Sequence, residues 1–156
     1  MKKFIMLSAA VFLTVISTSC ALFEKTPEIK LREFSQQDLD AAKVTAGTFA
    51  ESFILALKTD DFAVWQKHIP PQSAHRITSR NFKDMRQELL DTFGTFTSGS
   101  YFGEVTNGDL RTYLWKLTFI GEKNGKQAVH EVIYFVRVFC AEGKAPAISR
   151  FGVKIL

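Results

Sequence analysis

The chain has 156 residues, with 20 lysines and arginines against 16 aspartates and glutamates and a net charge of +4. Without residues 1–19, which have the character of an export signal, 137 residues remain, and these carry 18 basic and 16 acidic side chains. That length suits one domain with a full core. A nearly balanced charge differs from the concentrated basic face of a nucleic-acid-binding protein, so we expect no nucleic-acid partner. The 15 phenylalanines predict a large aromatic interior or an apolar pocket.

Residues 1–19 have the layout of a signal peptide. Lys2 and Lys3 precede the uncharged run 4–16, which is shorter than the roughly 20 apolar residues of a membrane-spanning helix. The sequence STSC then ends at Cys20. It resembles the lipobox of bacterial lipoproteins, in which small residues precede a cysteine that is acylated and becomes the mature N-terminus. Ser17 departs from that motif, which usually has an aliphatic residue there.

Two processing events are compatible with Cys20. In the one that we favour, acylated Cys20 anchors an exported protein to a membrane, facing the periplasm or the cell surface, and residues 20–34 are the lipidated cysteine and a tether. Residue 21 is an alanine, whereas an aspartate at this position would resemble an inner-membrane retention signal. The alanine therefore favours the outer membrane. In the alternative, ordinary signal cleavage releases a soluble protein, and a disulfide between Cys20 and Cys140 becomes possible in an oxidising compartment.

The domain at residues 35–156 is predicted to begin with three helices. Ser35 is a good N-cap, and apolar residues spaced by three and four from Leu39 to Leu57 predict a long helix with one face in a core. A short helix over 62–69 is expected to stop at Pro70 and Pro71. A brief extended piece at 75–77 and a third helix, capped by Thr78 or Ser79 and ended by Gly94, follow.

The apolar period then changes to two, which predicts four strands at about 97–105, 110–120, 127–141 and 147–155. Asn-Gly pairs at 107–108 and 124–125 predict tight turns, and residues 142–144 turn the last pair. Short turns make neighbouring strands antiparallel. The expected fold class is therefore α+β, with three helices packed on one face of a four-stranded antiparallel meander.

This order of elements resembles the nuclear-transport-factor-2-like cone of the SnoaL-like and cystatin-like families. The segment FAESFILALKTDDFAVWQKHI is similar to the opening of small bacterial domains of that superfamily, in which a long helix ends in a k-x-d-[FYW] turn. The resemblance covers residues 35–156. It implies a curved sheet around a hollow that different members use for ligands, catalysis or partner binding, and it brings no catalytic signature.

Strand alternation assigns side chains to the inside of this hollow. The inward set is aromatic and contains no carboxylate, so we expect a non-catalytic pocket for a small apolar ligand. Cys140 and Ser149 are expected to point inward too. The residues expected to line the pocket are Tyr113, Trp115, Phe119, His130, Tyr134, Val136 and Phe151.

Two other functions compete with ligand binding. An isomerase- or dehydratase-like enzyme of the same fold would depend on His130 and Tyr134, with Tyr113 nearby, but a tyrosine of ordinary pKa is a poor base at neutral pH. A structural dimerisation module would fill its interior with its own side chains. The histidines at 68, 75 and 130 lack the spacing of metal ligands, so neither a metal nor a cofactor is expected.

The outward side chains of the sheet mix basic and large apolar residues. Such a surface predicts an interface with an envelope protein or with a second copy of the chain. A further basic cluster at 76, 80, 83 and 86 is interpreted as a solvated helix face, with an anion or lipid-headgroup contact as the alternative. The residues of the predicted interface are Lys116, Ile133, Phe135, Arg137, Phe139 and Arg150.

Overall fold

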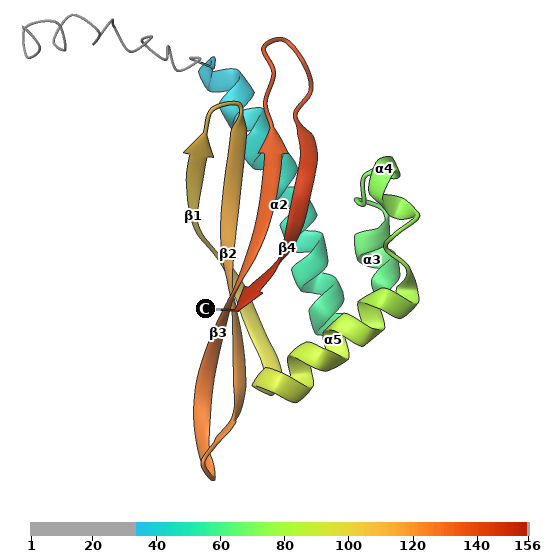
Figure 1. The fold of residues 1–156 in the computed structure, drawn as a ribbon, viewed down its shortest axis with the longest axis vertical. Helices are drawn as coiled ribbons and strands as arrows, with labels where there is room; N and C mark the ends of the chain where they lie inside the picture. The colour runs from blue at the N-terminus through green and yellow to red at the C-terminus, as the bar shows by residue number, and fades with distance from the viewer. Residues whose placement is uncertain (1–33, 156) are drawn as a thin grey trace, which may run out of the picture. The chain divides into compact units, whose positions relative to one another are not determined.

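The structure is a computed structural model that describes residues 34–155, with the backbone alone at residue 155. The predicted signal peptide at 1–19, Cys20 and the predicted tether up to residue 33 lie outside the described residues. Residues Arg32–Leu156 form one compact unit. Its elements, in chain order, are α2 (Gln36–Thr59), α3 (Phe62–Gln66), α4 (Pro71–Ala74), α5 (Ser79–Phe93), β1 (Thr95–Asn107), β2 (Leu110–Lys123), β3 (Lys126–Phe139) and β4 (Ala147–Ile155) (Figure 1).

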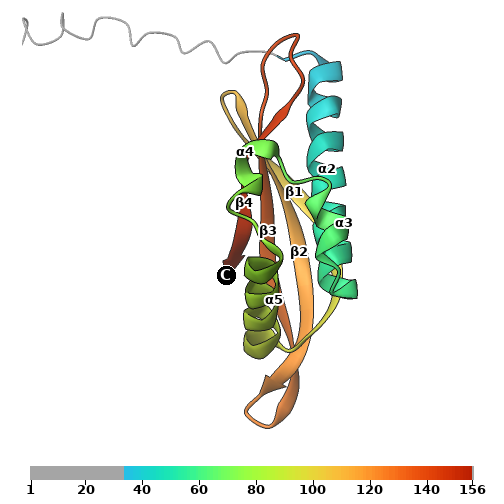
Figure 2. The ribbon, with the colours of Figure 1, turned by 90° about the vertical axis from the view of Figure 1, so that its right-hand side faces the viewer.

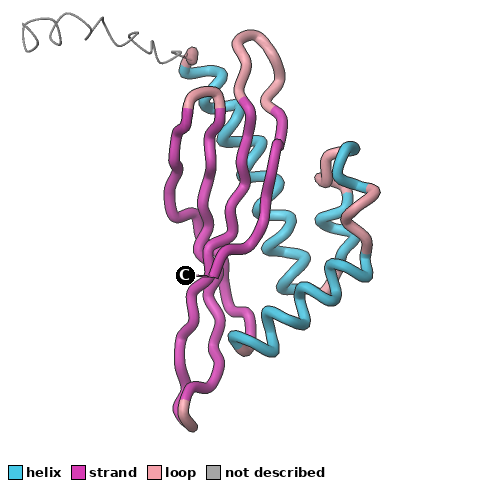
Figure 3. Tube along the Cα trace, viewed as in Figure 1, coloured by secondary structure: helices cyan, strands magenta, loops and turns pink. Residues whose placement is uncertain are grey.

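The four strands form one antiparallel sheet in the order β1-β2-β3-β4. The helices all precede the strands (Figure 3), and they lie on one face of the sheet (Figures 1 and 2). Gly108, Asn124 and Gly125 adopt positive φ angles at the hairpin turns, as two-residue turns require. The α+β class and the four-stranded antiparallel meander are confirmed.

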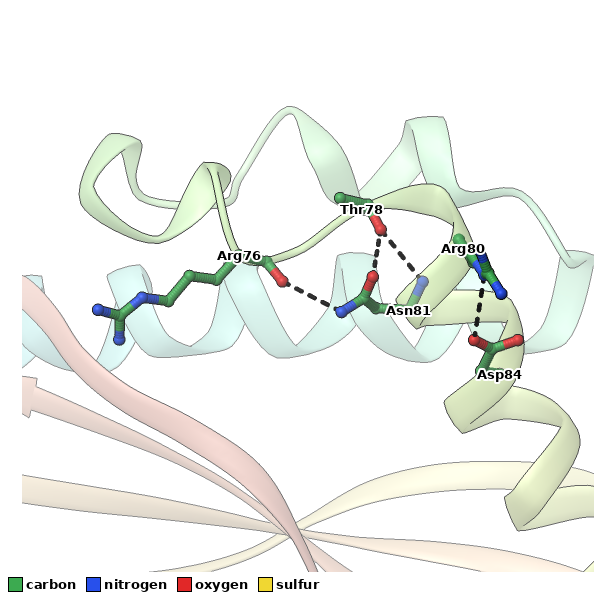
Figure 4. Close-up of polar contacts among 5 residues, drawn as sticks. All are labelled: Arg76, Thr78, Arg80, Asn81 and Asp84. Atoms are coloured by element: carbon green, nitrogen blue, oxygen red, sulfur yellow. Dashed lines mark hydrogen bonds and ion pairs between the residues drawn. The ribbon is translucent and has the colours of Figure 1, made fainter.

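Side-chain caps set the helix starts as the sequence predicts. The Ser35 hydroxyl accepts the N–H of Asp38 at 3.2 Å, and the Thr78 hydroxyl accepts the N–H of Asn81 at 3.2 Å (Figure 4). The Asn81 side chain also donates to the carbonyl of Arg76 at 3.4 Å, which ties α5 to the preceding turn. These bonds satisfy N–H groups that have no partner within a helix.

The segment between α3 and α5 differs from its prediction. The second helix ends at Gln66 rather than at 69, and Pro71 begins α4 instead of ending a helix. Proline fits this position because its missing N–H would have no helical partner and its φ angle is already helical. The predicted extended piece at 75–77 was wrong, since His75 caps α4, and the domain has four helices before the sheet rather than three.

The last strand contains a bulge that the sequence did not predict. Arg137 pairs with Arg150, whereas Val138 pairs with Ile148, so Ser149 is left unpaired. The Ser149 hydroxyl donates to the carbonyl of Arg137 at 3.2 Å and is exposed, while Ile148 packs against the core. The prediction that Ser149 points inward was wrong because a bulge shifts the side-chain alternation by one residue.

Aromatic side chains from the helices fill the space over the sheet. Phe53 of α2 stacks on Tyr134 of β3, with ring centroids 4.2 Å apart and an interplanar angle of 15°. Trp65 of α3 lies 4.9 Å from Phe53 and 5.6 Å from Phe151 of β4, both edge to face. The described residues thus join every element except α4 around one buried cluster, and we expect the unit from residue 32 onward to fold without residues 1–31.

Candidate functional site

Most of the residues predicted to line a pocket lie in the core. Tyr113, Phe119, Tyr134 and Val136 have exposed fractions of 0 or 1%. They face the centre of the sheet's helix side, where Phe49, Phe53, Trp65 and Phe82 fill the space. Phe151 also packs against this cluster, and His130 is half-buried beside Phe93. The interior that the sequence predicts as a hollow is occupied by the protein's own side chains.

An open groove lies instead between the long helix and the first two strands. Its volume is about 520 Å³, within the range of about 300–1,000 Å³ that is typical of small-molecule sites. Of the predicted pocket residues, only Trp115 borders it. The groove is lined by Lys43, Val44, Gly47, Thr48 and Glu51 of α2, Tyr101 of β1 and Trp115 of β2.

Two aromatic rings form the sheet side of the groove. Tyr101 and Trp115 are directly paired across β1 and β2, and their ring centroids are 5.7 Å apart at 73°. The Lys43 ammonium lies 5.2 Å from the centre of the Tyr101 ring, a cation–π distance. Glu51 lies eight residues further along α2, about 12 Å at 1.5 Å per residue. The groove therefore has an apolar floor, and its helical wall carries the positive charge of Lys43 toward one end of the groove and the negative charge of Glu51 toward the other.

Gly47 forms the helical wall opposite this floor. It lies inside the 24-residue helix α2, where glycine is about 1 kcal/mol less favourable than alanine. A Cβ atom added at Gly47 would meet no heavy atom within 4 Å, so packing does not require a glycine there. A large side chain at this position would enter the groove, whereas glycine or alanine leaves it open.

Glu104 supports the aromatic wall from the end of the sheet, and the sequence analysis missed it. Its carboxylate lies 3.3 Å from the Arg111 guanidinium. Burial raises the pKa of Tyr101, as do the negative charge of Glu104 and a hydrogen bond to it. Glu104 pairs with the inward residue Tyr113, because β1 has register shifts at 96/98 and 101/103. A carboxylate therefore does lie on the helix side of the sheet, which regular alternation in β1 could not indicate.

The residues of the catalytic alternative are not brought together. His130 and Tyr134 are four residues apart on β3, about 13 Å at the strand rise. Burial raises the pKa of Tyr134 well above its ordinary value, and its hydroxyl has no hydrogen-bond partner among the described residues. Burial also raises the pKa of the Cys140 thiol, against the lowering effect of Arg111, and a protonated thiol is a weak nucleophile. These groups offer no proton relay.

The six predicted interface residues share the face of the sheet that points away from the helices. Lys116 is paired with Ile133, and Arg137 with Arg150. The basic cluster near α5 is partly engaged within the domain. Arg80 lies 4.0 Å from Asp84 (Figure 4), and Arg86 lies 3.5 Å from Asp60 and donates to the carbonyl of Leu57 at 2.9 Å.

The described segment offers neither a metal-binding cluster nor a membrane-spanning helix. Residues 34–155 contain no group of three or more His, Cys, Asp or Glu side chains placed to hold a metal ion. None of the helices in this segment is both long and apolar enough to span a membrane. No protein-family model matches the sequence, and no curated protein matches it.

Proposed function

We propose that this protein is a lipid-anchored cell-envelope protein whose domain binds a small apolar ligand in the groove between α2 and β1, without catalysing a reaction. The export signal at residues 1–19 and Cys20 support the anchor. The order of helices and strands supports a nuclear-transport-factor-2-like fold for the domain. The observation that carries the proposal is the groove of about 520 Å³ beside the Tyr101 and Trp115 rings, into which Gly47 projects no side chain.

The groove favours a ligand with a flat apolar body and one anionic group. Tyr101 and Trp115 offer ring surfaces on which such a body would stack. The Lys43 ammonium attracts an anionic group toward its end of the helix, and Glu51 repels it from the other end. The two charges would thus fix the direction in which the ligand lies.

The lining of the groove supports binding rather than catalysis. It contains one carboxylate, Glu51, and no histidine, cysteine or second acid. General acid–base chemistry needs a donor and an acceptor of protons within reach of the substrate. Glu104 is outside the lining and is engaged by Arg111.

Native mass spectrometry of the protein extracted from its own membrane tests both parts of the proposal. We expect acyl chains on Cys20 and a co-purified compound of low mass. Gly47→Trp should lose the compound because the indole fills the groove. Gly47→Ala is the matched control, which should keep the compound and gain about 0.5–1 kcal/mol of stability from helix propensity. Retention of the compound by Gly47→Trp would place the ligand elsewhere, and an unmodified Cys20 would refute the anchor.

A structural dimerisation module is the second candidate, and the filled interior favours it. Phe53 and Trp65 leave no hollow over Tyr134, so the interior contributes stability rather than a binding site. The homodimer through the outer sheet face that the sequence predicts belongs to this candidate. It requires a dimer in analytical ultracentrifugation and no co-purified compound.

A further inference from the structure

The outer face of the sheet exposes several large apolar side chains. The helices cover one face of the sheet (Figures 1 and 2), and the outer face is the opposite one. It includes four of the eight exposed large hydrophobic side chains of the described chain. Their exposed fractions are 56% for Val105, 36% for Ile120, 66% for Val129 and 43% for Phe139. Ile120 and Val129 are directly paired toward one end of the sheet, and Val105 and Phe139 lie toward the other. Exposed apolar side chains grouped in this way often mark an interaction site.

Basic side chains are interleaved with these apolar residues. Two successive cross-strand rows on β2–β4 are Lys116–Ile133–Lys154 and Leu114–Phe135–Gly152, and the next row brings Arg137 opposite Arg150. At Gly152 the absent side chain leaves room for the Phe135 ring, from which an added Cβ would lie 3.3 Å away. The surface therefore alternates positive and apolar rows.

The charges on these rows are poorly neutralised within the domain. Lys116 forms an ion pair of 2.8 Å with Glu131. Arg137 donates to the Thr112 hydroxyl at 3.2 Å, and neither Arg137 nor Arg150 forms an ion pair among the described residues. Two like charges directly opposite each other on adjacent strands destabilise a sheet. An anionic partner would remove that repulsion.

We propose that the outer face docks on the surface of an anionic phospholipid bilayer. Basic side chains bind lipid phosphates and apolar side chains enter the headgroup boundary, which is the combination that this face presents. A second copy of the chain fits less well, because face-to-face packing would bring the lysines and arginines of both copies together. The inference rests on the proposed function in one respect. A tether at residues 20–34 reaches at most about 50 Å, so an anchor at Cys20 keeps the domain beside a bilayer.

Vesicle co-sedimentation of residues 32–156 tests the docking without the anchor. We expect binding to vesicles that contain phosphatidylglycerol, weaker binding at high salt, and none to phosphatidylcholine alone. The double variant Arg137→Gln/Arg150→Gln should bind about thirtyfold more weakly, because each basic residue near an anionic surface contributes about 1 kcal/mol to binding. Phe139→Ser should also weaken binding, and thermal unfolding checks that each variant is folded.

The matched control removes two positive charges from the helix side of the domain. Lys67 and Lys83 are exposed and form no ion pair with another described residue, so Lys67→Gln/Lys83→Gln should bind almost like the parent. Equal losses in both double variants would show attraction by net charge alone and overturn the proposal. A stable dimer that ignores vesicles and is broken by Phe139→Ser would overturn it in favour of a second copy. Because residues 32–156 lack Cys20, neither result depends on acylation or on the groove.

Discussion

Removing the hydroxyl of Tyr134 is expected to stabilise the protein. Its exposed fraction is 1%, and the hydroxyl oxygen has no hydrogen-bond partner among the described residues. Burying a polar group without a partner costs about 1–3 kcal/mol. Tyr134→Phe keeps the ring that stacks on Phe53 at 4.2 Å and removes only the oxygen. Allowing for the small void, we expect a gain of about 1–2 kcal/mol, which corresponds to a rise of about 4–8 °C in Tm for a domain of this size.

Urea unfolding and thermal unfolding at pH 7 measure this gain. Tyr113→Phe is the matched control, because Tyr113 has the same exposed fraction but its hydroxyl is not among the buried atoms without a partner; it should gain no stability. The reasoning is refuted if Tyr134→Phe is destabilised by about 1 kcal/mol or more. Such a loss would mean that the hydroxyl bonds to a group outside the described chain, and Tyr134 would then deserve study as a binding residue.

Two further predictions concern the backbone and the response to alkali. Gly94→Ala should lose about 3 kcal/mol or more of unfolding free energy in urea, because Gly94 has φ +90° and an added Cβ would lie 2.2 Å from the carbonyl oxygen of Ile120. The control Gly108→Ala, with φ +57° and open space around the added Cβ, should lose only about 1 kcal/mol. Equal losses would refute the steric argument. Burial, followed by the negative charge of Glu104, raises the pKa of Tyr113 to about 12 from 10.0. Folding therefore favours the neutral phenol of Tyr113. Its contribution to the free energy of unfolding is fully present below pH 10 and falls by about 1.4 kcal/mol per pH unit as the pH rises from 10 to 12. Tyr113→Phe should flatten the pH dependence by that amount, and an unchanged slope would contradict the raised pKa.

The sequence predicts the sheet well because its signals are local. Gly108 and the pair Asn124-Gly125 place the hairpins, and period-two alternation correctly places Trp115 and Tyr134 on the helix side. Those signals do not predict the bulges, because a bulge inserts one extra residue at a position that periodicity does not mark. For this reason Ser149 was placed on the wrong face and Glu104 was not recognised on the helix side.

The location of the groove depends on distances that a sequence pattern does not contain. Alternation identifies which side chains face the helices, but it does not indicate how far the helices stand from the sheet. Here Phe53 and Trp65 are large enough to reach Tyr134 and close the centre. Gly47 was a visible signal, since an isolated glycine within a helical pattern calls for a packing or functional explanation.

The filled centre and the open edge of the domain have one physical origin in α2. This helix presents large rings over β3, where Phe53 contacts Tyr134, and it presents the half-buried Gly47 to the groove that Tyr101 and Trp115 also line. The large rings hold the helix at a fixed distance from the sheet. At that distance a small residue cannot reach the opposite wall, so a gap remains beside it. The core thus holds the groove open, and a ligand could enter there without any change in the packing of the interior.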